Sequence, residues 1–148
     1  MNELVEKLIE KNEKQREVLL ELQEILSSEK EMLKKSNSGN LPGILEKLQE
    51  VSGRAMLAEA QRDRAAGELA HVLGCRPVVS QICEYLDSEA NYRLQSSAKD
   101  LLAAVVSIKE LNFVISRQAD EHRFLADMIL EKLRSFGGAS RAGLDRRA

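Results

Sequence analysis

Few residues of this chain could carry out chemistry. The two cysteines, Cys75 and Cys83, lie eight positions apart and do not form the CxxC pair typical of redox and zinc sites. His122 follows an aspartate and a glutamate, but neighbouring residues of a helix point to different faces, so the three side chains cannot converge on one metal ion. We therefore expect no metal site. We expect His122 at the edge of a helical bundle, Cys83 as a small buried residue and Cys75 as a loop thiol.

The chain also lacks the short motifs of common enzymes. It has no glycine-rich phosphate loop, no nucleophile elbow and no helical zinc-protease signature, so we expect neither catalysis nor a cofactor. With 22 basic and 24 acidic residues, the formal net charge of −2 does not favour nucleic acid. The N-terminus lacks the basic start of a signal peptide, and the longest apolar run, residues 101–106, is too short to span a membrane. These features predict a cytoplasmic protein with reduced thiols.

The composition predicts helices. Aromatic residues make up only 3% of the chain, and there are two prolines and no tryptophan. A β-sandwich or β-barrel needs aromatic and β-branched strands with frequent Gly/Pro turns, and the chain lacks that composition. Its abundant residues are strong helix formers.

The first amphipathic stretch, residues 2–35, carries apolar residues at the a and d positions of a heptad: Leu4, Leu8, Val18, Leu22, Ile25 and Met32. Lys11, Gln15 and Glu29 interrupt this seam. Residues 36–40 favour a turn, in which Gly39 can end the helix, and Pro42 suits the first turn of the next helix.

The second stretch repeats the heptad and is interrupted by Arg62; its apolar positions are Leu41, Ile44, Leu48, Val51, Ala55, Ala58, Ala65, Leu69 and Val72. A short connection between two long helices predicts an antiparallel hairpin. If Leu33 faces Ile44, paired residue numbers add to about 77, and Gln15 then lies opposite Arg62. In that layer the Gln15 carbonyl can accept a hydrogen bond from the guanidinium, and we expect both side chains to reach water.

A second break follows at residues 74–77, where Gly74 can cap a helix and Pro77 can begin another. Residues 78–86 predict a short helix that buries Val79, Ile82, Cys83 and Leu86, and residues 87–89 predict a kink or an N-cap. The third long helix, residues 90–136, holds a and d through Leu94, Ala98, Leu101, Val105, Ile108, Asn112, Ile115, Ala119, His122, Ala126, Ile129, Leu133 and Phe136. Asn112 is expected to set register or to bond across the seam.

The predicted fold is therefore all-α: an elongated antiparallel helical hairpin plus a short helix and a long third helix, in a coiled-coil-like bundle. We expect one domain over residues 1–136 and a flexible basic tail over residues 137–148, with Arg141, Arg146 and Arg147 solvated.

The third helix carries more apolar residues than its seam requires, and all three phenylalanines of the chain lie in its C-terminal half. These residues either complete the bundle core or form a strip that binds a protein partner, and the sequence leaves both possibilities open. The candidate partner-binding residues are Leu111, Phe113, Val114, Phe124, Leu125, Met128, Ile129, Leu133 and Phe136.

Four segments resemble the FlgN family of flagellar export chaperones over most of residues 1–136. They are the leucine-rich residues 19–26 with Glu29 and Leu33; residues 44–48 with Arg54; residues 72–74; and the segment 108–112, Ile-Lys-Glu-Leu-Asn, with Ile115, Leu125 and Ile129. The last looks like the family's Leu-Asn-x-x-Asn segment, with Ile115 in place of the second asparagine.

The resemblance implies a cytosolic, non-enzymatic helical chaperone. It would hold hook-associated junction proteins through its C-terminal amphipathic helix and pass them to the export gate and its ATPase-associated components. Two other functions compete with it. One is a general coiled-coil adaptor that dimerises through the third helix, and the other is a secretion chaperone for another cargo, such as the filament cap.

Overall fold

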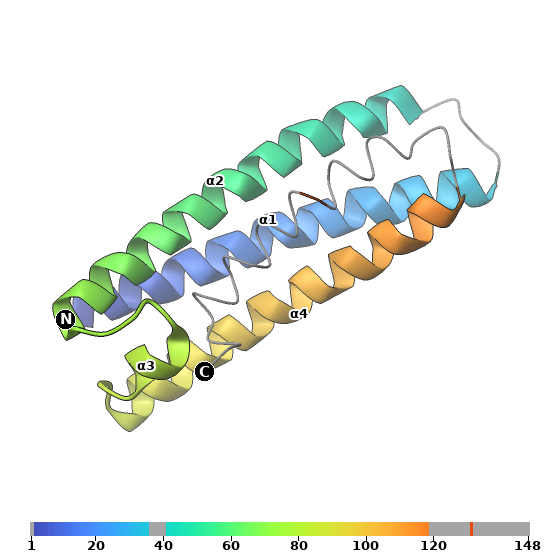
Figure 1. Cartoon of the computed structure of the whole chain (residues 1–148). Helices are drawn as coiled ribbons and strands as arrows, with labels where there is room; N and C mark the ends of the chain where they lie inside the picture. The colour runs from blue at the N-terminus through green and yellow to red at the C-terminus, as the bar shows by residue number, and fades with distance from the viewer. Residues whose placement is uncertain (1, 36–40, 119–130, 132–148) are drawn as a thin grey trace.

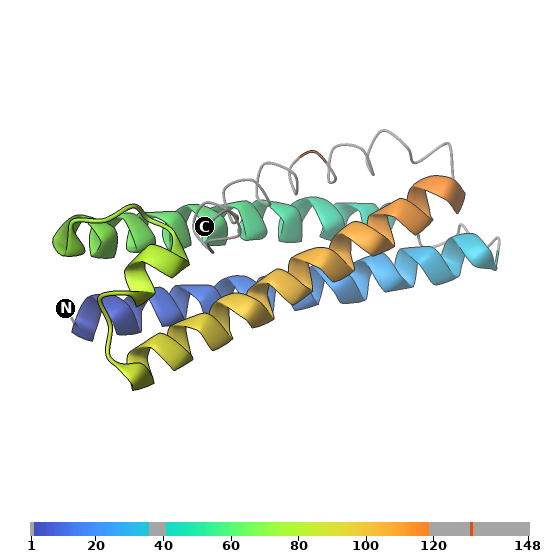
Figure 2. The same ribbon diagram turned by 60° about the horizontal axis from the view of Figure 1, so that its bottom comes forward.

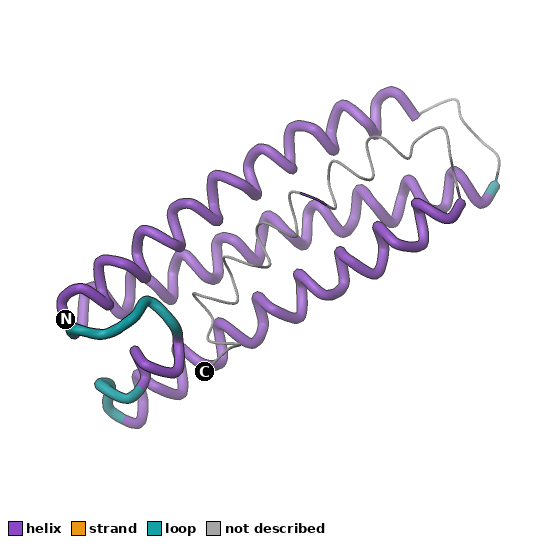
Figure 3. The backbone as a smooth tube through the Cα atoms, viewed as in Figure 1, coloured by secondary structure: helices purple, strands orange, loops and turns teal. Residues whose placement is uncertain are grey.

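The computed structural model describes residues 2–35, 41–118 and 131, and these residues form an all-helical bundle, as predicted. Three long helices run beside one another: α1 (Asn2–Lys34), α2 (Leu41–Leu73) and α4 (Ser88–Gln118) (Figure 1). A short helix, α3 (Val79–Cys83), lies between α2 and α4, and Figure 3 shows the loops on either side of it. The expected turn at 36–40, the third helix beyond Gln118 and the tail 137–148 lie outside the described residues.

Helix α1 is the centre of the bundle. It packs against both α2 and α4, whereas α2 and α4 have no close backbone approach to each other in the described part of the chain. The hairpin makes α2 antiparallel to α1, and α3 turns the chain so that α4 runs parallel to α1, crossing it obliquely in Figure 2. Because α1 has two partners, it buries a second stripe beside the predicted seam: Val5, Ile9, Asn12, Leu19 and Leu26. The single seam predicted for this helix was incomplete.

Two ion pairs fix the register of the hairpin. The Lys7 ammonium lies 3.1 Å from the Glu68 carboxylate, and the Arg54 guanidinium lies 2.8 Å from that of Glu21. The residue numbers add to 75 in each pair, against a predicted sum of about 77, so the predicted register holds to within two residues.

Local capping ends α2 and begins α4 at the predicted breaks. Gly74 has a φ of 71°, its N–H donates to the carbonyl of His71, and the Cys75 N–H donates to the carbonyl of Ala70. These two bonds form a Schellman C-cap, in which the left-handed residue is normally glycine. The Asp87 carboxylate accepts a hydrogen bond of 2.8 Å from the Ala90 N–H, so it is the N-cap of α4.

The predicted heptad positions of α4 form its buried face: Leu94, Ala98, Leu101, Val105, Ile108, Asn112 and Ile115 are all 5% exposed or less. On α2 the prediction is wrong at Val72, which is 59% exposed, while Ala70 is buried and Leu73 packs against the core. The reason is geometric: a straight helix has 3.6 residues per turn, so its buried face drifts away from a strict seven-residue repeat by about 20° per heptad.

Alanine substitutions at Gly74 and at Gly53 should change the free energy of unfolding in opposite directions. Gly74→Ala should lower the free energy of unfolding by about 1–2 kcal/mol, because alanine is strained in the left-handed conformation. Gly53→Ala, in the exposed interior of α2, should raise it by about 1 kcal/mol through helix propensity. An added Cβ meets no atom within 4 Å at either glycine, so neither effect involves a clash. Urea denaturation followed by circular dichroism measures both, and a gain at Gly74 would refute the cap.

Candidate functional site

An apolar strip is exposed on α4. Phe113 is 61% exposed and Val106 is 46% exposed, and Leu102, four residues before Val106, is half-buried. Spacings of four and seven residues place all three on one side of the helix. The Arg117 guanidinium carbon lies 5.7 Å from the centroid of the Phe113 ring, within cation–π range. This part of α4 therefore presents a large aromatic surface that the bundle core does not use.

The structure divides the predicted partner-binding residues. Phe113 is exposed, whereas Leu111 and Val114 are half-buried, and Leu111 packs against the core cluster. Leu111 and Phe113 are two residues apart, so they project about 160° apart around the helix and do not share a strip. The other six candidates lie outside the described residues: Phe124, Leu125, Met128, Ile129, Leu133 and Phe136.

The middle of the bundle contains buried polar residues. Arg62 is fully buried; one of its nitrogens lies 2.5 Å from the carboxylate of Asp63, while Nε and Nη1 find no partner among the described residues. Gln15 is also fully buried, and neither of its amide atoms has a partner in that part of the chain. The expectation that both side chains reach water is therefore wrong. The predicted Gln15–Arg62 hydrogen bond is also wrong: the guanidinium contacts Asp63 and not Gln15.

Asn112 shows the same lack of partners. It is fully buried in the seam of α4 as predicted, but its side-chain oxygen and nitrogen make no hydrogen bond within the structure described here. A bond across the seam is therefore not formed. The buried amide of Asn12 on α1 is better placed, because its nitrogen donates to the Ser97 hydroxyl over 3.0 Å and so fixes α4 against α1.

Glu59 is a carboxyl group in an unfavourable environment. Burial and the nearby charge of Asp63 raise its pKa to about 7, and the attraction of Arg62 opposes that rise. Burial also raises the pKa of Glu29, a buried residue of α1. The folded protein therefore binds a proton at each of these groups more tightly than the unfolded chain does.

The described residues form no catalytic or metal centre. No three His, Cys, Asp or Glu side chains among them gather as metal ligands. Cys83 is buried and Cys75 is partly exposed, as predicted, and no disulfide joins them. Burial raises the pKa of the Cys75 thiol, and the charge of Glu84 adds to the effect, which lowers the fraction of reactive thiolate. His122 and the three tail arginines lie outside the described residues.

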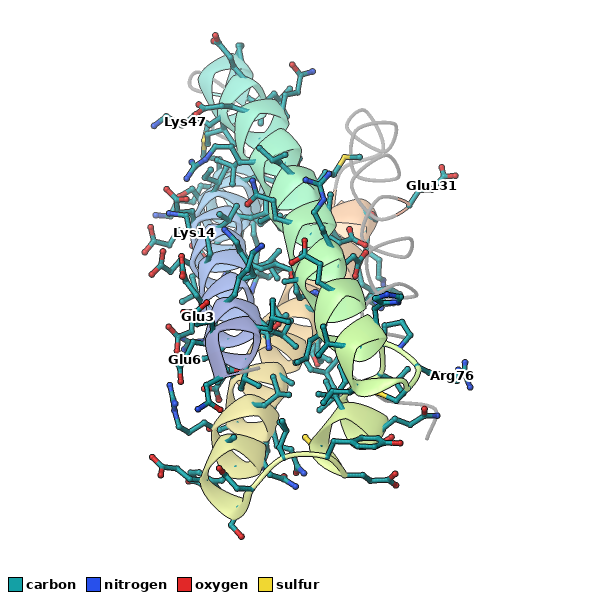
Figure 4. The ribbon with its side chains drawn as sticks, turned by 90° about the vertical axis from the view of Figure 1, so that its left-hand side faces the viewer. Glu3, Glu6, Lys14, Lys47, Arg76 and Glu131 are labelled. Carbon is teal, nitrogen blue, oxygen red and sulfur yellow. The ribbon has the colours of Figure 1, made fainter. Side chains whose placement is uncertain are left out.

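A shallow groove of about 410 Å³ lies between α1 and α4. It is lined by Ile9, Glu13, Arg16, Glu17, Tyr92, Arg93, Ser96, Ser97 and Asp100. No histidine stands beside the two serines in this lining. Figure 4 shows Glu3, Glu6 and Lys14 on the outer side of α1, projecting away from the bundle.

This fold is a bundle of long helices with an exposed apolar strip on α4. The sequence model of the FlgN family, described as FlgN protein, matches residues 1–137, and the chain belongs to this family of flagellar export chaperones, which are not enzymes. No curated protein and no solved structure matches the chain. None of the helices described is long and apolar enough to cross a membrane.

One residue of the family resemblance has a clear structural role. Arg54, which follows the segment 44–48, makes the ion pair with Glu21 that joins the two helices of the hairpin. Met56, which no sequence pattern singled out, is 47% exposed on α2.

The raised pKa of Glu59 predicts how stability depends on pH. Its folded-state pKa of about 7 exceeds the ordinary value of 4.5, so the folded chain binds the proton more tightly than the unfolded chain. The free energy of unfolding should therefore fall as pH rises from about 4.5 to 7. Glu59→Gln should flatten this slope, leaving a smaller one from Glu29, and should be more stable than the wild type at pH 8. Urea denaturation at several pH values across this range measures the free energy of unfolding and its slope.

Glu46→Gln, at an exposed carboxylate of the same helix, is the matched control and should keep the wild-type slope. Parallel pH profiles for the wild type and Glu59→Gln would show that this carboxyl does not control the effect.

Proposed function

We propose that this protein is a cytoplasmic export chaperone that binds hook-associated junction proteins through the apolar surface of its C-terminal helix and delivers them to the type III export apparatus. The delivery partners would be the export gate and its ATPase-associated components. The family assignment supports a flagellar chaperone, and the single observation that supports the binding surface is Phe113, an aromatic side chain that is 61% exposed on α4.

The physical mechanism is burial of one helix on another. A terminal segment of the cargo, unfolded before export, becomes helical when its apolar residues cover Phe113 and Val106. Each Å² of apolar surface removed from water contributes about 25 cal/mol, and the ordering of the segment offsets part of that gain. The resulting moderate affinity keeps the cargo from polymerising early and still allows its release at the membrane.

The structure disfavours the coiled-coil adaptor. That function requires the a and d residues of the third helix to pair with a second copy, but Ile108 is fully buried and Ile115 is 1% exposed within one chain. Both belong to the core cluster. Dimerisation through this seam would require α4 to leave α1.

The remaining alternative is a chaperone for another exported protein, such as the filament cap. It would use the same surface, so the two functions differ only in which cargo the chaperone binds. Titrating the chaperone with the hook-associated proteins and the cap protein of the same bacterium, side by side, identifies which one binds tightest.

Phe113→Asp tests the proposed surface. Because the ring is mostly exposed, the variant should keep its helicity and its melting temperature within a few degrees, yet lose capture of a hook-associated protein by at least about tenfold in Kd. Phe124→Asp and Leu125→Asp, beyond the described residues, are expected to behave in the same way.

Leu57→Asp is the matched control, because Leu57 is 60% exposed and lies on α2, outside the proposed surface. It should bind cargo as the wild type does. Ile115→Asp gives the contrasting result for a core residue and should unfold the bundle. If Phe113→Asp also unfolds the chain, or folds and binds cargo normally, the surface is assigned wrongly.

A further inference from the structure

The ion pairs of α1 show which sides of α2 and α4 face the same way. Glu6 pairs with Arg93 of α4, and its neighbour Lys7 pairs with Glu68 of α2. Glu6 projects from the outer side of α1 (Figure 4), and Lys7 is also exposed, so both pairs lie along the solvent-exposed side of α1. The flanks of α2 and α4 that point away from these pairs therefore both face the opposite side of the bundle. Because the two helices do not approach each other closely, these flanks are separate surfaces on either side of α1.

Each flank presents residues at helical neighbour spacing. On α2 they are Met56, Glu59 and Asp63, at positions i, i+3 and i+7, and Glu59 lies about 140° around the helix from Arg54, which pairs with α1. On α4 they are Leu102, Val106 and Phe113, and Leu102 lies about 180° from Arg93. We name these six residues the α2–α4 face.

The exposed apolar groups of this face come from both helices. Met56 is 47% exposed, Val106 46% and Phe113 61%. A helix laid between α2 and α4 would contact all three, whereas a helix on α4 alone would leave Met56 in water. It would also occupy the fourth position of a four-helix bundle, which buries the apolar stripe of each member most completely.

The charge on this face is one-sided. Glu59 and Asp63 are half-buried carboxyl groups on the α2 flank, and the neighbouring cation, Arg62, already contacts Asp63 and is itself buried. Like charges at this spacing repel each other, and one cation cannot balance two carboxylates, so the pair lacks a full counter-charge. On the α4 flank a charged neighbour of Phe113 is Arg117, of the opposite sign.

We propose that the cargo segment binds as an amphipathic helix between α2 and α4, burying Met56 together with Phe113, and places a lysine or arginine against Glu59 and Asp63. This inference rests on the proposed function and specifies its partner: an apolar stripe with a basic residue on the flank that faces α2. The basic residue sets orientation and specificity, and the apolar residues supply most of the affinity.

Neighbouring residues of α2 provide the test. Met56 and Leu57 are both exposed and point about 100° apart, so Met56→Asp should weaken binding of a purified hook-associated protein about tenfold, and Leu57→Asp should not. At pH 8, where Glu59 is ionised, Glu59→Gln should weaken binding about fivefold and reduce its dependence on salt, and Glu46→Gln should do neither. Circular dichroism confirms that each variant is folded.

Each outcome decides between the two claims. Loss of binding by Phe113→Asp together with Met56→Asp and Glu59→Gln supports the inference. If only Phe113→Asp loses binding, the cargo lies on α4 alone, and this inference is overturned while the proposed function stands. If the wild type binds no hook-associated protein, the proposed function itself fails. Tighter binding by Met56→Asp would mean that another part of the chain covers the face, and a wild-type dimer that Met56→Asp dissociates would mean that a second copy does; either result overturns the inference.

Discussion

The structure depends on the simultaneous burial of two sides of α1. A helix with one partner needs a single apolar stripe, but α1 packs against both α2 and α4 and buries a wider surface that includes Leu8, Leu19, Leu22 and Leu26. Since α2 and α4 do not approach each other, neither can be held without α1. The hairpin register, the direction of α4 and the separate flanks of the α2–α4 face all follow from this arrangement.

The bundle is packed least favourably in its middle, where buried polar residues lie. Gln15 and Arg62 are fully buried there, and each has polar atoms without hydrogen-bond partners among the described residues. Every such atom costs about 1–3 kcal/mol relative to a satisfied one. The apolar layers on both sides, with Leu8 and Leu69 in one direction and Leu22 and Leu48 in the other, offset that cost. The bundle is therefore anchored towards its ends and is less stable near Glu59.

The sequence predicted the features that depend on local spacing. Heptad positions identified the buried face of α4, and Gly74 and Asp87 marked the helix ends, because capping needs only the residues at the cap. The features that depend on how helices meet were not predicted. The second stripe of α1 appears only when a third helix is placed, and Val72 is exposed because a straight helix drifts from the heptad. Arg62 contacts Asp63 and not Gln15, and no pattern of apolar residues could indicate that contact. For the binding surface, the sequence identified Phe113 as apolar excess, but it could not separate Phe113 from Leu111 or add Met56 from another helix.

The hydrogen bond between Asn12 and Ser97 joins residues 85 positions apart, whereas the Arg54–Glu21 pair of the hairpin spans 33. Closing the longer loop costs roughly 1 kcal/mol more chain entropy, and contacts distant in sequence form more slowly than local ones. The α1–α2 hairpin is thus complete in sequence before α4 has been synthesised, and α4 joins it last. The helix that carries Phe113 is accordingly the part of the bundle whose attachment relies most on long-range contacts, so its docking is the late step of folding and its detachment the early step of unfolding.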